Sequence, residues 1–387
     1  MKLASLLNNR FFKIICIIYL LLKPFYFFDS GSPQISDFIV LPAMALYFIK
    51  NRPLSLIKEK AVRYILAFLG LVCFVNIIYA TLVFEGYQWT FLKPIFYYSY
   101  NIVLFFFFLS LFKPFVKKDY VILLWVFFGS LLIQYAMILL DIDKGVVNNF
   151  QGRDYNFFNN PNQLSYYSIV VLTMLFFIRK HVLDLPYLFS LCVSLSLVII
   201  LCATSFPTLV GGVILLLLYF LIIAKQHFLK HLFLLVFPLL LLVLVKKEDV
   251  SREYERITAR FENPEKRMNA TYADRGYDRL FEFPEYVLYG AGEGMNERFV
   301  PQDIKRPQEI HNLFGNILFS YGIFGCVLFL MFLYHVFSTV SKVELLYLVP
   351  LLLYNMVHNG VRFSFVWVLF ALILIRKKKS IDYLITK

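Results

Sequence analysis

The residues best suited to chemistry in this 387-residue chain surround one polar stretch, residues 246–310, which His311 and Asn312 follow directly. His311 titrates near neutral pH, so it can accept a proton from a hydroxyl group and serve as a general base. A lone histidine at the start of an apolar run is also a common polar cap of a helix. Both interpretations of His311 stay open at this point.

Arginines recur in the polar stretch at a spacing of four residues. On a helix, Arg252, Arg256 and Arg260 would lie on one face and repel one another. Lipid headgroups or a phosphorylated substrate would relieve that repulsion. Local ion pairs with Glu248 and Glu255 are the alternative.

The same spacing returns further along the polar stretch. Arg275 and Arg279 alternate there with Asp274 and Asp278, a pattern that suits either a phosphate-binding face or a salt-bridged helix. The segment Gly290-Ala291-Gly292-Glu293-Gly294 can bring backbone amides close to a phosphate. No strand precedes these glycines, so they do not indicate a nucleotide-binding fold.

A second polar segment, residues 141–162, carries Arg153 and the sequence Asn160-Pro161-Asn162. Asn-Pro-Asn before an apolar run predicts a turn and a helix cap, and a capped helix start explains Asn162 without any functional role. Arg153 is one of few cations in the short segments of this kind. A third segment, residues 203–212, is too short for a domain, and its Thr, Ser and Pro residues suit helix ends.

The composition indicates the class of protein that holds these residues in position. Sixty per cent of the chain is hydrophobic, 16% is charged, and the mean hydropathy is +0.70, which excludes an ordinary soluble domain. The formal charge of +13 lies mainly in short breaks between apolar runs, so we expect no nucleic acid partner. The five cysteines fall inside apolar runs without metal-ligand spacing, so neither a disulfide framework nor a metal site is predicted.

A helix needs about 20 residues to cross a bilayer, and the long apolar runs favour helices over a barrel. The sequence predicts an all-α polytopic membrane protein with about twelve spans. They are residues 11–28, 35–49, 64–84, 94–111, 120–140, 164–178, 185–203, 207–224, 232–245, 313–337, 345–356 and 363–375. The chain then divides into residues 1–245 with nine spans, a large outer loop at 246–311, and residues 312–387 with three spans and a tail.

The basic residues predict the orientation. Lys and Arg follow the second, fourth, sixth and eighth spans and fill the tail at residues 376–379, which places both termini in the cytoplasm. Counting spans then places the large loop outside.

Several short motifs carry a resemblance to a known family. They are Asn160-Pro161-Asn162, Thr204-Ser205, Tyr289-Gly290-Ala291-Gly292-Glu293-Gly294 after Pro284, and His311-Asn312 followed by Leu318 and Tyr321-Gly322-Ile323-Phe324-Gly325. In their order along nearly the whole chain they resemble the O-antigen polymerase and ligase superfamily (Wzy type). The His-Asn and Gly-Ile-x-Gly segment is the most specific part.

The resemblance implies a membrane glycosyltransferase of the C-type kind on the outer (periplasmic) face of the bacterial inner membrane. Its substrates would be oligosaccharides on undecaprenyl diphosphate, and a chain-length regulator protein and membrane lipids would be its partners. It implies His311 and Arg153 as catalytic residues and Arg275 and Arg279 as substrate-binding residues. The family often has Ser-Arg where this chain has Ser205-Phe206-Pro207, so one expected phosphate contact is missing.

Position in the polar segments adds further substrate-binding candidates. They are Arg252, Arg256, Asn160, Asn162 and Asn312. The donor would already be linked to lipid, so we expect no cofactor and no required metal. A polymerase is favoured over a ligase, which would transfer glycan to the lipid A core. A flippase or other transporter is the remaining alternative, but the expected spans hold few midplane charges and no repeat of one half in the other.

Overall fold

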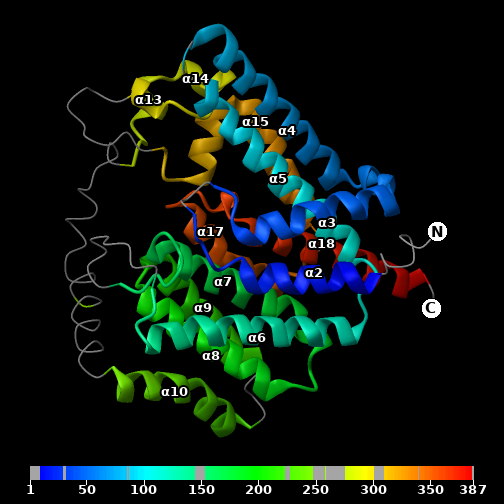
Figure 1. The fold of residues 1–387 in the computed structure, drawn as a ribbon, viewed down its shortest axis with the longest axis vertical. Coiled ribbons are helices and arrows are strands. Elements are labelled where there is room, and N and C mark those ends of the chain that lie inside the picture. The colour runs from blue at the N-terminus through cyan, green and yellow to red at the C-terminus, as the bar shows by residue number, and fades with distance from the viewer. Residues whose placement is uncertain are drawn as a thin grey trace. The chain divides into compact units, whose positions relative to one another are not determined.

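The computed structural model describes residues 9–28, 32–84, 86, 88–143, 153–222, 227–246, 258, 275–299, 309–338 and 340–385, with side chains for all of these except 54 and 376–385. In these ranges the chain is helical and contains no β-strand (Figure 1). The predicted all-α class is confirmed for this part of the protein.

The chain forms two compact units, each assembled from separate stretches. Unit 1 comprises Met1–Arg52, Leu111–Glu262 and Lys342–Tyr354, and unit 2 comprises Pro53–Ser110, Asn263–Ser341 and Asn355–Lys387. The division into residues 1–245, 246–311 and 312–387 concerns membrane topology and stays a prediction.

Unit 1 holds the helices α2 (Asn9–Leu22), α3 (Ile35–Asn51), α6 (Lys117–Leu139), α7 (Pro161–Ile178), η3 (Arg179–His181), α8 (Pro186–Ala203), α9 (Phe206–Ile222), α10 (Phe228–Val245), α16 (Lys342–Leu345), η5 (Leu346–Leu348) and α17 (Val349–Asn355, ending at the boundary). Unit 2 holds η1 (Leu54–Lys58), α4 (Lys60–Ile78), the π-helical turn η2 (Tyr79–Val83), α5 (Gln88–Phe112, to its last turn), α13 (Arg279–Glu282), α14 (Glu285–Tyr289), η4 (Asn296–Phe299), α15 (Leu313–Phe337), η6 (Gly360–Arg362) and α18 (Ser364–Ile385). In unit 2, α4 and α15 pack side by side (Figure 1).

Among the described residues, seven helices are long and apolar enough to cross a membrane. They are Lys60–Val83, Gln88–Phe112, Lys117–Leu139, Pro161–His181, Pro186–Ala203, Phe228–Val245 and Leu313–Phe337; Phe206–Ile222 and Ser364–Ile375 are shorter apolar helices. These helices indicate a multi-pass membrane protein. The remaining expected spans coincide with α2, α3 and the helical segment that ends in α17, so the number twelve stays a prediction.

Two helices of unit 1 differ in how far their apolar side chains are buried. From Ser165 to Ile178 every residue of α7 is buried, as expected for a helix that is hydrophobic on all sides. In contrast, α10 leaves large side chains exposed, including Leu229 at 77% and Leu244 at 80%. An apolar helix with such an exposed face suits contact with lipid.

The polar breaks between the helices of unit 1 contact one another in two sets. One set joins the start of the first expected span to the breaks after the fourth, sixth and tenth. Its ion pairs are Lys13–Asp119 at 2.6 Å, Lys117–Asp184, and Lys180–Glu344 at 3.3 Å. The other set joins the ends of the first and seventh expected spans to the break after the fifth, and that break to the one after the ninth. Its contacts are Tyr26 N to Phe157 O at 3.1 Å, Arg153 Nε to Ala203 O at 2.9 Å, and the ion pair Lys246–Asp141.

In unit 2, helix α15 is interrupted at Gly322, which has φ 67° and ψ −173°. Two carbonyls just before the interruption accept hydrogen bonds from the polar stretch, Phe319 O from Ala291 N at 2.8 Å and Ser320 O from Gly292 N at 2.9 Å. In an apolar environment a broken helix persists only where protein satisfies the freed backbone groups. The glycine segment therefore docks at the break in α15.

The glycines permit this close approach. A Cβ on Gly322 would lie 2.4 Å from Leu288 O, and one on Gly290 would lie 2.7 Å from Ser320 O. Both residues also have positive φ, which favours glycine.

We predict that Gly322→Ala destabilises the protein by at least about 1–3 kcal/mol, since a side chain there adds backbone strain to the steric overlap. Gly70→Ala is the matched control, because Gly70 lies in the interior of α4 with no atom near its Cβ, and alanine there should raise the stability slightly. Thermal unfolding in detergent measures both. Equal melting temperatures for the two variants would contradict the role given to Gly322.

Candidate functional site

The cap of helix α15 is Asn312, not His311. The Oδ1 of Asn312 accepts a hydrogen bond from Gly315 N at 2.9 Å, and its Nδ2 donates to Met356 O at 3.0 Å. The interpretation of His311 as a helix cap is therefore wrong. Asn312, expected to bind substrate, has its amide engaged in ordering the backbone beside His311.

Backbone hydrogen bonds hold His311 on both sides. Its N–H donates to Arg275 O at 3.0 Å, and its carbonyl accepts from the Tyr277 hydroxyl at 3.0 Å. The His311 ring lies edge-on to the ring of His358, with 6.3 Å between their centroids. The imidazole is thus fixed at the end of the polar stretch, where α15 begins.

Partial burial lowers the pKa of His311 below its ordinary value. Glu309 opposes this shift, whereas the positive charges of Arg275, Arg279 and Arg362 add to it. Because the net shift is downward, the imidazole is neutral at pH 7 and can accept a proton. The protein thus brings Arg275 and Arg279 close enough to His311 to influence it.

The alternative of a salt-bridged helix at Arg275 and Arg279 is wrong. Arg275 and Gly276 form a turn in which Gly276 has φ +68°, and α13 begins only at Arg279. The Arg279 side chain folds over Gly276, and the residue is 3% exposed. Burial lowers its pKa, although the neighbouring Asp278 carboxylate opposes the shift.

Glu293 is a buried charge of unit 2 that its place in the glycine segment did not reveal. Glu293 is 5% exposed. Its carboxylate accepts hydrogen bonds from Tyr321 OH at 2.8 Å and Asn316 Nδ2 at 3.2 Å, and it forms an ion pair with Arg362. Burial alone would raise the pKa of Glu293, but Arg362 and these donors outweigh burial, so its pKa lies below the ordinary value. The Glu293 backbone N–H donates to Asn76 Oδ1 at 2.9 Å.

Arg362 and His358 were also missed. Both lie in the break between the last two expected spans, where His358-Asn359 repeats the His-Asn pair of residues 311–312. The repeated His-Asn pair could have indicated His358, and an arginine in a break otherwise poor in cations could have indicated Arg362.

The amides of the glycine segment are used within the protein. The N–H groups of Ala291, Gly292 and Glu293 donate to α15 and to Asn76. Arg298 Nη2 donates to Ala291 O and Gly292 O, the latter at 3.1 Å. The Arg298 guanidinium lies 4.4–5.1 Å from the ring centroids of Tyr79, Phe84, Phe91 and Phe299, and burial lowers its pKa to about 10. This segment is therefore fastened to the ends of α4 and α5.

Arg153 belongs to unit 1 and caps the end of helix α8. Its Nε donates to Ala203 O at 2.9 Å and to Thr204 Oγ1 at 3.1 Å, and its Nη2 donates to Ala203 O at 2.8 Å and Asn162 Oδ1 at 2.9 Å. A cation at a helix C-terminus is stabilised by the helix dipole. Arg153 thus ties the end of α8 to the start of α7.

The start of α7 corrects the role given to Asn162. The capping residue is Asn160, whose Oδ1 accepts from Gln163 N at 3.0 Å, and Pro161 occupies the first helical position. Asn162 instead binds Arg153, and its carbonyl accepts from Tyr354 OH at 3.2 Å. Helix α7 therefore has the predicted asparagine cap, but the capping residue is Asn160, two residues before Asn162.

The structure leaves three predicted arginines untested. Arg252, Arg256 and Arg260 lie outside the described residues. The other candidates fall into two separate groups, Arg153, Asn160 and Asn162 in unit 1, and Arg275, Arg279, His311 and Asn312 in unit 2.

In the described ranges, no group of three or more His, Cys, Asp or Glu side chains could hold a metal ion. One Asp-x-Asp pair is present at Asp141-Ile142-Asp143. Asp141 forms an ion pair with Lys246.

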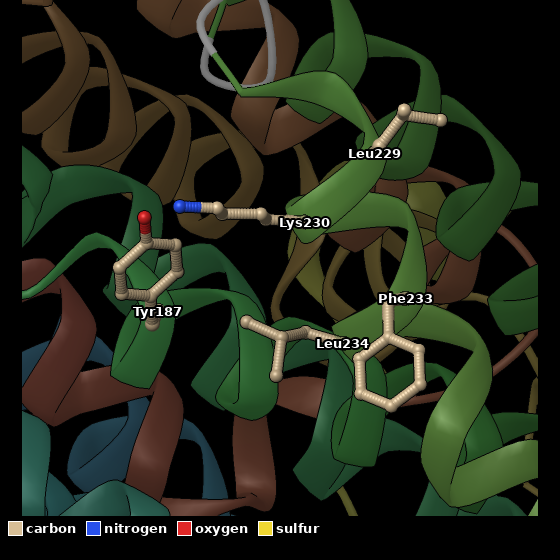
Figure 2. Close-up of a pocket in the computed structure, with 5 residues that line it drawn as sticks. All are labelled: Tyr187, Leu229, Lys230, Phe233 and Leu234. Carbon is tan, nitrogen blue, oxygen red and sulfur yellow. The ribbon is translucent and has the colours of Figure 1, made fainter.

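Unit 1 also has an open groove of about 390 Å³ between the starts of α8 and α10. It is lined by Tyr187, Leu229, Lys230, Phe233 and Leu234. Figure 2 shows the Lys230 ammonium group extending towards the Tyr187 hydroxyl beside the apolar side chains. No residue predicted to act in the site lines this groove.

No family model, curated protein or solved structure matches the chain.

We predict that Arg153→Ala lowers the stability by about 1–3 kcal/mol, the usual contribution of hydrogen bonds from a charged group. The end of α8 would lose its donors and Asn162 its partner. Lys118→Ala is the control, because Lys118 is an exposed cation of the same unit. An unchanged melting temperature for Arg153→Ala would show that these bonds do not stabilise unit 1.

Proposed function

We propose that the chain is a membrane glycosyltransferase that joins oligosaccharide repeat units carried on undecaprenyl diphosphate, as an O-antigen or related surface-polysaccharide polymerase. The reaction would take place on the outer face of the bacterial inner membrane. The observation that supports this most is the position of His311. Its backbone N–H is hydrogen-bonded to Arg275, and burial together with Arg275, Arg279 and Arg362 lowers the pKa of its imidazole. A base next to permanent cations suits transfer from a lipid diphosphate.

In this reaction an acceptor hydroxyl attacks the anomeric carbon of the donor glycan. His311 accepts the hydroxyl proton as the new C–O bond forms, and the bond from the anomeric carbon to the diphosphate oxygen breaks. Undecaprenyl diphosphate leaves with the bonding electron pair. The arginines stabilise the charge that grows on this leaving group, because guanidinium groups bind phosphate oxygens through two parallel hydrogen bonds.

The proposal also includes the other residues that the sequence predicted for the site. From the resemblance we propose Arg153 as a catalytic residue, although its donors already hold the end of α8. Arg252, Arg256, Asn160, Asn162 and Asn312 are proposed to bind substrate. For Arg153 the decisive comparison is Arg153→Lys, which retains a charge but not the paired contacts to phosphate.

The proposal includes twelve spans with both termini in the cytoplasm. The two sets of contacts in unit 1 support alternation, because each set joins breaks that an odd or even count of spans puts on the same side. Ions and polar groups on opposite sides of a bilayer would not meet in this way.

We predict that reporter fusions after Lys60, Lys118 and Lys379 give cytoplasmic signals, whereas fusions within residues 262–279 give outside signals. Lys and Arg in the short breaks fix this orientation. A reporter active in the cytoplasm when fused within residues 262–279 would contradict the proposal, since the site would face away from its substrate.

We predict that the purified chain, mixed with lipid-linked repeat units, produces a ladder of glycans on a gel. His311→Ala should slow its formation by about a hundredfold to ten-thousandfold, the usual contribution of a positioned base. His311→Asn, which keeps a polar side chain of similar reach, should be equally slow, while both variants remain in the membrane at normal abundance. Full activity of the Asn variant would assign proton transfer to another group.

The pH profile gives an independent check of the same base. Activity should fall as the pH drops through the pKa of His311, which lies below the ordinary histidine value because burial and three arginines lower it. The residual activity of His311→Asn should lack this acidic limb. An identical limb in both proteins would exclude His311 as its source.

A deletion strain separates the alternative functions. Loss of a polymerase leaves a single repeat on the lipid core, whereas loss of a ligase leaves no glycan there. Normal chains together with defective transport would indicate a flippase or other transporter and overturn the proposal.

A further inference from the structure

We infer that Arg362 binds the diphosphate of the lipid-linked donor, and that Glu309 occupies its guanidinium group until the donor arrives. This inference rests on the proposed function. It adds a binding residue and a competing carboxylate to the residues predicted from the sequence. The ligand class is a lipid diphosphate.

Arg362 lies where several parts of unit 2 meet. Its Nη2 contacts two carboxylates, Glu293 Oε1 and Glu309 Oε2. The guanidinium lies 5.1 Å from the centroid of the Tyr97 ring, and Asn101 Nδ2 donates to the Arg362 backbone carbonyl at 3.3 Å. The side chain is still 34% exposed, so a ligand can reach it.

The two carboxylates differ in how firmly they are held. Glu293 has a side chain that is 6% exposed and also accepts hydrogen bonds from Tyr321 and Asn316. Glu309 is 26% exposed, and within the described ranges Arg362 is the one partner of its carboxylate. Glu293 is therefore the more firmly held carboxylate, and Glu309 is the one that can exchange with a ligand, because it has fewer partners and is more exposed.

A diphosphate competes well for the position of Glu309. It carries more negative charge than a carboxylate and offers oxygens for two parallel hydrogen bonds from one guanidinium. Since Glu293 keeps its hold on Arg362, the cation stays in place while its second partner changes.

Unused polar atoms near Arg362 also indicate a polar ligand. Arg362 Nε and both amide atoms of Asn359 are buried without a hydrogen-bond partner among the described residues. Buried polar atoms are rarely left unpaired in a folded protein. Asn359 precedes Arg362 by one short turn, so these two donors and one acceptor belong to the same break.

The position of Glu309 connects this exchange to catalysis. It precedes His311 by two residues, and the charges of both Glu309 and Arg362 act on the His311 imidazole. A diphosphate on Arg362 would therefore place the leaving group within the same electrostatic environment as the proposed base.

The test measures binding of undecaprenyl diphosphate to the purified full chain in detergent, by the shift of the melting temperature with ligand concentration. Glu309→Gln removes the competing charge and keeps the shape, so binding should tighten by about tenfold, whereas Arg362→Lys should weaken it by at least as much. Glu285→Gln is the matched control, an exposed glutamate of the same unit that should bind as the wild type does.

The outcomes separate this inference from the proposed function. If the wild type binds the diphosphate and Glu309→Gln and Glu285→Gln bind equally, Glu309 does not compete and the inference is wrong, while the glycan ladder still decides the function. Tighter binding by Glu309→Gln supports the inference even if Arg362→Lys does not fold. If the wild type forms a ladder but Arg362→Lys binds the diphosphate normally, Arg362 is not the ligand-binding cation. A wild type that neither binds undecaprenyl diphosphate nor forms a ladder would overturn both.

Discussion

The ion pair between Glu293 and Arg362 organises the polar part of unit 2. A carboxylate that is 5% exposed persists only if its charge and its lone pairs are satisfied, and here Arg362, Tyr321 and Asn316 do so. Removing one partner would leave a buried charge unpaired, so each of these residues constrains the others. Because Glu293 comes from the polar stretch, Arg362 from η6 and the two neutral donors from α15, one buried charge fixes the relation of three segments.

The break in α15 follows the same rule. At Gly322 the helix departs from regular geometry, and the carbonyls of Phe319 and Ser320 accept hydrogen bonds from the glycine segment. A small apolar cluster packs at the same contact, with Ala291, Phe299, Ile310 and Phe319 at its centre. The docking of the polar stretch thus combines paired backbone groups with a small apolar cluster.

The helical class was predictable because long apolar runs leave few alternatives. Helix starts were predictable only approximately, since α15 begins at the expected residue 313 but α5 begins at Gln88, six residues before the expected start. Which asparagine caps, however, depends on the register of the first turn, and the sequence alone assigned Asn162 where Asn160 acts. The spacing of Arg275 and Arg279 suggested one helix, but Gly276 turns the chain between them. The pairing of Glu293 with Arg362 joins residues 69 apart, and no local pattern encodes it.

The two arginines most relevant to the proposed chemistry differ in what their donors already do. Arg153 uses its Nε and Nη2 groups on the end of α8 and on Asn162, so a phosphate would have to break bonds that hold two helices together. Arg362 is anchored through one carboxylate and meets a second that is partly exposed and has no other partner in the described part of the chain. A cation that serves a leaving group must be held in place and still have a partner that it can exchange. Of the two, Arg362 meets both conditions.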